Sequence, residues 1–207
     1  MNIENIKGAI CFISNTMQEN KDYLIQLDQQ NGDGDLGLTM SSGYKAIFEY
    51  INTTKETDLG IAFMKCSTIF NETSPSTLGT ITSVALMGMA KYLKGKTDVD
   101  LQDITLAMEA GINKVMDKAK SKLGDKTILD SIIPAVRALK ENMDLDVQEA
   151  FKLAADAARD GSESTKNMRS VHGRAAYYGD KSIGVIDGGS VVGKLIFDSI
   201  YKYCTRT

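Results

Sequence analysis

The spacing of the apolar residues is the feature that most constrains the fold of this chain. Apolar side chains recur at intervals of three and four residues along its length, as they do in Ile3, Ile6, Ile10 and Ile13. This spacing puts apolar residues on one face of an α-helix, and about eight segments show it. Their first apolar residues are Ile3, Met40, Ile61, Leu78, Leu101, Ile128, Val147 and Val191. Convincing alternation of apolar and polar residues, which would indicate β-strands, is absent.

The joins between these segments are short, so the sequence predicts an all-α domain whose helices run mostly antiparallel. Residues that commonly begin helices stand at several joins, namely Asp58, Asp100, Asp146, and Thr127 with Asp130 three residues later. No low-complexity linker or internal repeat divides the chain. We therefore expect a single domain over residues 1–207.

Composition excludes several classes of protein. The net charge of −3 and the pI near 5.3 offer no basic surplus for nucleic acid. No apolar run approaches the ~18 residues of a membrane span, and no signal peptide is visible at the N-terminus. Cys11, Cys66 and Cys204 are widely spaced and lack metal-ligand spacing, which indicates reduced thiols. Together these features predict a cytoplasmic protein.

Four stretches interrupt the amphipathic pattern, and each carries glycine with hydroxyl or charged residues. They cover residues 28–40, 73–83, 122–130 and 173–190. Each stretch joins two helices, and they precede the second, fourth, sixth and eighth expected helices. In an up-and-down bundle alternate joins lie at the same end. The sequence therefore predicts one composite site at one end of the molecule.

The first stretch crowds Asp28, Asp33 and Asp35 among glycines. Carboxylates on an adaptable backbone suit Mg²⁺ or Ca²⁺. An EF-hand that begins at Asn31 would need glycine and glutamate where Leu36 and Ser42 stand. The glycines also spell GxGxxG, but no strand precedes them and a pyrophosphate would be repelled. We favour cations held between the loop and a phosphate, with a solvated acidic turn at a helix N-terminus as the alternative.

The second stretch carries Ser76, Thr77, Gly79 and Thr80 at the start of an apolar helix. Hydroxyls and free N–H groups there could bind an anion, or Ser76 could simply cap the helix. In the third stretch Gly124 allows a turn and Thr127 can cap the helix that follows. We expect Asp125 and Lys126, in the same stretch, to form no more than a surface pair.

The fourth stretch places Arg174 between Gly173 and Ala175, so its guanidinium could reach a buried anion, stack on a flat ring, or lie at the surface. His172 is the only histidine, and no carboxylate stands at a fixed sequence spacing to orient it, so a catalytic role is disfavoured. The run 188–195 matches a P-loop until Leu195 replaces the required Ser or Thr. We interpret that run as a turn that enters the last helix.

Together the four stretches resemble the L subunit family of dihydroxyacetone kinase. Their family patterns read roughly LDxxxGDGDHGxNM, GxSGxLYG, GDKTMLDAxxP and GRAxYLGxRSxGxxDPGA. The corresponding stretches here are 27-LDQQNGDGDLGLTM-40, 76-STLGTITS-83, 124-GDKTILDSIIP-134 and 173-GRAAYYGDKSIGVIDGGS-190. The second match is weak, whereas the third and fourth are specific. The resemblance extends over nearly the whole chain.

This resemblance implies an eight-helix antiparallel up-and-down barrel with a nucleotide at one end. It implies that Asp28, Asp33 and Asp35 hold two Mg²⁺ ions against a tightly bound, non-exchanging ADP. No side chain would act as a catalytic residue, because the nucleotide itself carries the phosphate. The implied nucleotide contacts are Leu36, Gly37, Leu38, Thr39, Ser76, Thr77, Leu78, Gly79, Gly124, Thr127, Ile128, Arg174, Asp187 and Gly188.

The resemblance also implies two protein partners and leaves a homodimer open. A phosphohistidine protein of the phosphotransferase system would phosphorylate the ADP, and a separate K subunit would present dihydroxyacetone or a related hydroxyketone. A chain of this length that begins at Met1 favours the separate-subunit form over the fused ATP-dependent kinases. The alternative is a non-catalytic regulatory or interaction module with the same fold and nucleotide.

Five positions depart from the family pattern. Leu36 replaces His, Thr39 replaces Asn, Leu78 replaces Ser, Ile128 replaces Met and Gly188 replaces Pro. Leu36 and Leu78 each remove a polar group from the expected phosphate end, which favours the non-catalytic alternative. We expect metal binding to survive these departures.

Overall fold

The structure is a computed structural model that describes residues 1–206, so the last residue of the expected domain, 207, lies outside the described residues. Nine α-helices and two 3₁₀ helices make up this part of the chain, and its sole β-type pairing is an isolated bridge between Asn2 and Asp98. The α-helices are α1 (Ile3–Glu19), α2 (Lys21–Asp28), α3 (Leu36–Thr53), α4 (Leu59–Thr73), α5 (Thr77–Leu93), α6 (Leu101–Ala119), α7 (Leu129–Glu141), α8 (Val147–Ser164) and α9 (Gly188–Cys204). The 3₁₀ helices are η1 (Thr165–Asn167) and η2 (Arg174–Ser182). The all-α prediction is confirmed.

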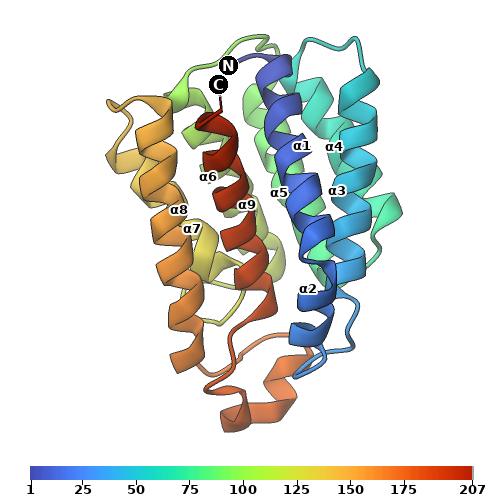
Figure 1. Ribbon diagram of the computed structural model, residues 1–207, viewed down its shortest axis with the longest axis vertical. Coiled ribbons are helices and arrows are strands. Elements are labelled where there is room, and N and C mark those ends of the chain that lie inside the picture. The colour runs from blue at the N-terminus through green and yellow to red at the C-terminus, as the bar shows by residue number, and fades with distance from the viewer. Residues whose placement is uncertain (207) are drawn as a thin grey trace.

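The long helices form a closed ring. Going round it, α1 packs on α3, each helix from α3 to α8 packs on the next, and α9 packs on both α8 and α1 (Figure 1). Helices α1 and α2 follow one another directly, with a break at Asn20, where the backbone leaves helical geometry. The described part of the chain thus has one α-helix more than expected, because α2 extends the first rod of an eight-rod barrel.

Both termini lie at one end of the barrel, and the four sequence stretches lie at the other (Figure 1). The joins 29–35, 74–76, 120–128 and 165–187 all occur where the chain turns at the lower end of the figure. The up-and-down order of the helices produces this grouping, since every second join returns to the same end. The prediction that the stretches would meet is confirmed.

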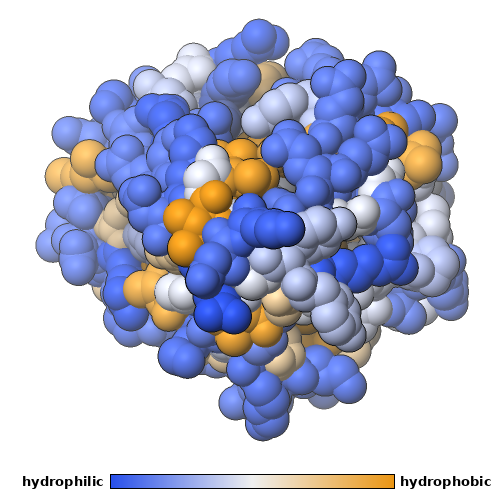
Figure 2. Space-filling view, turned by 90° about the horizontal axis from the view of Figure 1, so that it is seen from below, coloured by the Kyte–Doolittle hydropathy of each residue, from blue (hydrophilic) through white to orange (hydrophobic). Residues whose placement is uncertain are grey.

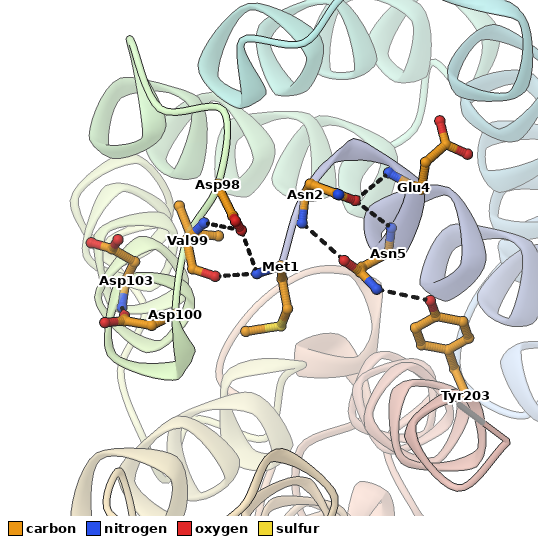
Figure 3. A network of polar contacts seen from close by, with 9 residues as sticks. All are labelled: Met1, Asn2, Glu4, Asn5, Asp98, Val99, Asp100, Asp103 and Tyr203. Atoms are coloured by element: carbon orange, nitrogen blue, oxygen red, sulfur yellow. Dashed lines mark hydrogen bonds and ion pairs between the residues drawn. The ribbon is translucent and has the colours of Figure 1, made fainter.

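The seam between α1 and α9 closes at the end that carries the termini (Figure 3). The Asn2 side chain accepts hydrogen bonds from Glu4 N and Asn5 N and so caps α1, while Asn5 Nδ2 donates to Tyr203 Oη at 3.5 Å. A Cβ on Gly8 would lie 2.2 Å from the Tyr203 ring. Glycine at this position therefore lets α9 approach α1 closely enough to complete the ring.

The core lies inside the ring and consists of the apolar stripes read from the sequence. Met17, Met40, Ile47, Phe70 and Phe151 are all at most 2% exposed. Burial of such side chains is the main stabilising contribution, at about 25 cal/mol per Å² of apolar surface. An apolar cavity of about 400 Å³ runs within the ring. No helix in the described residues is both long and apolar enough to span a membrane.

Most of the predicted helix starts are confirmed. The side chains of Asp58, Asp100 and Asp146 each accept a backbone N–H of the first turn that follows. Two details differ. Helix α7 begins at Leu129, so Thr127 stands one residue before the N-cap, and its Oγ1 accepts from Leu129 N. The run 188–195 is helical from its first residue, because Asp187 already caps α9, so the expected turn there is wrong.

Candidate functional site

A cavity of about 1140 Å³ opens where the four loops meet. Its walls come from the loop between α2 and α3, the start of α5, the end of α6 with the loop that follows it, and the segment before α9. Ile81, Val115 and Ile128 line both this cavity and the apolar cavity inside the ring, so they separate the two. Figure 2, seen from below, shows this end to be mainly hydrophilic with an apolar patch near its centre.

The loop between α2 and α3 is built around the side chain of Asp28. Asp28 Oδ2 accepts hydrogen bonds from Gly34 N at 2.8 Å and from Leu36 N at 3.4 Å. Gly34 has φ +78°, and a Cβ on Gly32 would lie 2.2 Å from Asp28 Oδ1. These two glycines are required because the loop turns tightly against a carboxylate.

The loop brings three carboxylates together. One oxygen from each of Asp28, Asp33 and Asp35 can be chosen so that all lie within 4.8 Å of one another. Asp35 occupies the N-cap position of α3 but its side chain makes no capping hydrogen bond, so its oxygens remain available. Desolvation, followed by the charges of Asp33 and Asp28, raises the pKa of Asp35. A cation bound among these oxygens would remove that repulsion, and all-oxygen ligands suit Mg²⁺.

Arg174 reaches across the cavity mouth to this cluster. Its Nη1 lies 2.7 Å from Asp33 Oδ2, and both side chains are substantially exposed. The pairing brings the fourth sequence stretch to the first, as the composite site required. Because exposed ion pairs are worth only about 0–1 kcal/mol, a divalent cation or an anionic ligand can replace either partner at little cost.

The start of α5 faces the same cavity. Ser76 caps the helix by accepting from Gly79 N at 3.0 Å, and Ser74 Oγ anchors the preceding turn by donating to Thr39 O at 2.9 Å. Among the described residues, the backbone N–H groups of Thr77 and Leu78 find no acceptor. A helix N-terminus with free N–H groups favours an anion, and Ser76, Thr77 and Thr80 add hydroxyls to the lining.

The loop between α6 and α7 folds around Asp130, which is 1% exposed. Its two oxygens accept from Gly124 N at 2.6 Å and from Thr127 N at 2.7 Å. Gly124 has φ +95°, so the predicted turn is confirmed, and Lys126 also has positive φ at +61°. The expected surface pair is wrong, because Asp125 and Lys126 are 5% and 4% exposed and each bonds to a different partner. Their burial follows from the tight backbone turn, which aims both side chains inward.

His172 has the orienting carboxylate that its sequence neighbourhood lacks. Asp125 Oδ2 lies 2.9 Å from His172 Nε2, and Asp125 Oδ2 also accepts from Lys122 N. Hydrogen bonds from His172 and from Lys122 hold the pKa of Asp125 below its usual value despite burial. The separation of 47 positions between Asp125 and His172 explains why sequence spacing could not reveal the pair. His172 lines the cavity beside Arg174.

The N-cap of α9 forms part of the cavity floor. Asp187 Oδ2 accepts from Ser190 N at 2.6 Å, while Asp187 N donates to Thr165 Oγ1 at 3.0 Å. Desolvation raises the pKa of Asp187 to about 7, and the charges of Asp130 and Asp28 act in the same direction. The site thus holds one carboxyl group whose charge changes near neutral pH.

Leu36 packs into the floor of the cavity, against the start of α9. It is 6% exposed, and a Cβ on Gly188 would lie 2.7 Å from its Cδ2 atom. The two departures from the family pattern at these positions are therefore in contact. The Leu36 side chain fills the space that a side chain at position 188 would need. A glycine at position 188 is therefore sterically compatible with leucine at position 36.

The structure brings most of the expected site residues together. The cavity lining contains Asp28, Asp33, Asp35, Leu36, Ser76, Thr77, Leu78, Thr127, Ile128, Arg174, Asp187 and Gly188. Five others lie beside the lining. Gly37 packs on Lys21 O, Leu38 points outward and is 49% exposed, Thr39 and Gly79 support the turn before α5, and Gly124 supports the third loop. Their roles as ligand contacts stay predictions.

The lining residues that sequence reasoning missed include Lys118, Lys126 and His172. For Lys126 a signal existed, because it follows Gly124 in a tight glycine-containing turn. For Lys118, on an otherwise amphipathic helix, and for His172 no local pattern distinguished a site residue from a surface residue.

Comparison with known proteins adds independent information. A family described as DAK2 domain matches residues 30–202. The chain is 31% identical over 187 residues to the ADP-binding subunit DhaL of PEP-dependent dihydroxyacetone kinase 1 of Listeria innocua, and the match covers 90% of this chain and 89% of that subunit. It is 30% identical over 212 residues to a probable dihydroxyacetone kinase of Dictyostelium discoideum, with 96% of this chain covered.

The chain spans only 33% of the length of the Dictyostelium protein. The dihydroxyacetone kinase of C. freundii has a similar fold, with a TM-score of 0.78 at 18% identity over 95% of this chain and 34% of that one. The same kinase in complex with AMP-PNP and Mg²⁺ gives a TM-score of 0.75 at 19% identity, over 95% of this chain and 33% of that one. At these identities the structural likeness establishes the fold alone.

Proposed function

The chain belongs to the DAK2 domain family, and from that premise we propose that it is the nucleotide-holding part of a dihydroxyacetone or related hydroxyketone kinase. It holds Mg–ADP as a tightly bound coenzyme that gains a phosphoryl group from a phosphohistidine protein and yields it to the substrate on a K-type partner. The observation that carries this proposal is the cluster of Asp28, Asp33 and Asp35 at the mouth of a cavity that also receives a helix N-terminus.

We propose that the aspartate cluster holds a pair of Mg²⁺ ions. Three carboxylates share a region 4.8 Å across, and two of them are exposed, so water and phosphate oxygens can complete the coordination. Asp28 also accepts hydrogen bonds from two backbone N–H groups, so the loop conformation is fixed without a bound metal. Bound Mg²⁺ would supply neutralisation of the phosphate charge, which phosphoryl transfer requires more than a protein nucleophile.

The start of α5 fits the phosphates. The free N–H groups of Thr77 and Leu78 and the hydroxyls of Ser76 and Thr80 line the cavity that the carboxylates share. Thr127, Ile128 and Gly188 line the same cavity, and we propose that they contact the rest of the nucleotide. Leu78 reduces the number of hydroxyls here but leaves the backbone donors intact.

Arg174 takes a second position in this proposal. If Asp33 served as a metal ligand, the guanidinium of Arg174 would be released from Asp33 and could bind the phosphate group instead. A planar guanidinium suits phosphate because it can donate two parallel hydrogen bonds. The weak exposed pair with Asp33 keeps Arg174 at the mouth until then.

The relatives support two forms of partnership. The Listeria protein is named as an ADP-binding subunit of a PEP-dependent kinase, and the chain covers most of it. The Dictyostelium protein is about three times longer than the matched region, so there a domain like this one is part of a larger kinase. We propose a K-type partner in both cases and a phosphohistidine donor for the PEP-dependent form.

The departure at Leu36 does not favour the non-catalytic alternative. Leu36 is buried against Gly188 below the loop, and its backbone N–H still donates to Asp28. The change is therefore absorbed by packing, and the three carboxylates keep their places.

Phosphate uptake tests this function. The purified chain, with Mg²⁺, is mixed with phosphoenolpyruvate and the general components of a phosphotransferase system, and the bound nucleotide is released with acid and analysed. We expect ADP to become ATP, and to return to ADP when a K-type protein with dihydroxyacetone is added. If ADP is bound but is never phosphorylated, the non-catalytic module is supported instead.

A further inference from the structure

Lys126 has an unusual environment for a lysine. Its side chain lies almost completely buried beneath the segment that precedes α9, and its Nζ donates to the carbonyl oxygens of Met168 at 3.1 Å, Ser182 at 2.5 Å and Val185 at 2.7 Å. A lysine ammonium has three N–H donors and no acceptor. All three donors are therefore used on main-chain carbonyls, and within the described residues Lys126 forms no salt bridge.

The three carbonyls come from both ends of one segment, residues 168–185, which we call the flap. Met168 lies at its start, whereas Ser182 and Val185 lie near its end. Between them the flap carries His172 and Arg174, which line the cavity. A single ammonium group thus draws together the two ends of the segment that presents these side chains.

The protein maintains this contact against two unfavourable effects. A buried ammonium loses its hydration, and desolvation lowers the pKa of Lys126. The backbone of Lys126 also has φ +61°, a conformation that residues with a Cβ adopt rarely. Backbone strain of this kind persists where surrounding structure enforces it, often at functional sites.

Most of the other polar contacts of the flap are local or lie at the surface. Within it, Ser182 Oγ accepts from Ser170 N and donates to Gly179 O. Toward its surroundings, Gly184 N donates to Lys166 O just before the flap, and Val171 N donates to Asp125 O at 3.4 Å. His172 contacts Asp125, and Arg174 contacts Asp33 at the exposed mouth. Several flap side chains are exposed, including Val171, Tyr177 and Ile183. Few apolar contacts therefore hold the flap, which increases the importance of the buried ammonium.

We infer that Lys126 is a positioning residue that clamps the flap over the cavity, so that Arg174 and His172 face the bound nucleotide. It acts through the flap and does not itself transfer the phosphate. What the flap covers depends on the proposed function, whereas the clamp itself depends only on the contacts of Lys126.

The test compares three substitutions of Lys126 with one control. Lys126→Met keeps the aliphatic stem and removes all donors, Lys126→Gln keeps two donors, and Lys126→Gly removes the side chain while it relieves the positive φ. Lys120→Met is the matched control, because Lys120 lies in the same loop, also has positive φ at +52°, and is exposed. Amide hydrogen exchange of residues 168–185 is followed in each full-length variant, with and without Mg–ADP, and the Kd for Mg–ADP is measured by calorimetry.

We expect Lys126→Met and Lys126→Gly to raise the exchange rate of flap amides about tenfold or more without nucleotide, and to raise the Kd for Mg–ADP about tenfold. Lys126→Gln should give intermediate values, and Lys120→Met should match the wild type. The exchange of α3 and α4 should not change, which separates flap release from general unfolding. If Lys126→Met does not fold, the intermediate result expected of Lys126→Gln decides the matter.

If folded Lys126→Met or Lys126→Gln exchanged its flap amides at the wild-type rate, the inference that Lys126 holds the flap would be overturned. Faster flap exchange with an unchanged Kd would overturn the positioning role. If the wild-type chain binds no Mg–ADP at all, the proposed function fails, but the exchange result still decides whether Lys126 holds the flap.

Discussion

Asp33 illustrates how a single carboxylate can serve two partners. It pairs with Arg174 at 2.7 Å and also belongs to the cluster that we propose to bind Mg²⁺. A side chain that holds an arginine in one state and a metal in another couples metal binding to the position of that arginine. Desolvation, and then the charges of Asp33 and Asp28, raise the pKa of Asp35, and a bound cation would relieve the repulsion among the three carboxylates.

Replacement of Asp33 by Asn tests this at the residue scale. We expect Asp33→Asn to unfold at about the wild-type temperature without ligand, since an exposed ion pair is lost and a repulsion is removed. With Mg–ADP at about 100 times the wild-type Kd, the wild type should gain about 2.7 kcal/mol and the variant much less. Asp22→Asn, on the exposed side of α2, is the control. An equal thermal shift in Asp33→Asn and wild type would contradict the assignment.

Asp187 should make stability depend on pH. Its pKa is about 7 in the folded protein and near 3.8 in the unfolded chain, so the folded state binds more protons between these values. This group therefore contributes stability at low pH that is lost as pH rises from about 4 through about 7. Asp187→Asn, which preserves a capping side chain, should remove that contribution.

The measurement for Asp187 is the melting temperature of both proteins in EDTA, without nucleotide, at pH 5 and pH 8. Relative to wild type, Asp187→Asn should be more stable at pH 8 than at pH 5. A constant difference between the two proteins across this range would show that Asp187 does not titrate there.

At the scale of helices and loops, the sequence predicted the helices, whose apolar residues recur at regular intervals. It missed the loop contacts that join residues distant in the sequence. Apolar spacing revealed the long helices, and acidic residues such as Asp58 and Asp100 marked where they begin, because both signals are local. Because every second join of an up-and-down bundle lies at the same end, the order of the helices was enough to predict that the four loops meet. The break at Asn20 was missed, because apolar spacing continues across it into Leu24 and Leu27.

The contacts of Lys126 and His172 could not be predicted for the opposite reason. Each joins residues more than 40 positions apart through a loop whose backbone adopts positive φ. Composition makes a Lys next to an Asp look like a surface pair, since both are usually exposed. Only the path of the loop around Asp130 turns them inward.

The flap should respond to ligand as a unit. Arg174 and Lys181 are exposed and lie at the two ends of η2, where trypsin could cleave. We expect Mg–ADP to slow tryptic cleavage in the flap, because a bound phosphate would hold Arg174 and the backbone near it. Fragments are followed by mass spectrometry, with cleavage at exposed Lys65 on α4 as the internal reference. Equal protection at both places, or none in the flap, would contradict this view.

For the whole molecule, the ring of helices gives the two ends of the barrel different roles. At the end with the termini, the contact between Asn5 and Tyr203 joins α1 to α9, while the opposite end gathers the four loops around the cavity. The helices form the rigid wall on which four loops are mounted. This arrangement allows residues distant in sequence to form one site without any of the helices changing its packing.

The most direct test of the account is the content of the protein itself. The chain is purified without added nucleotide, denatured with acid, and analysed for nucleotide by chromatography and for metal by elemental analysis. We predict about one ADP and about two Mg²⁺ per chain, with both lost in Asp33→Asn and retained in Asp22→Asn. Purified wild-type protein that carries neither nucleotide nor Mg²⁺, and that binds neither when both are supplied, would contradict the account.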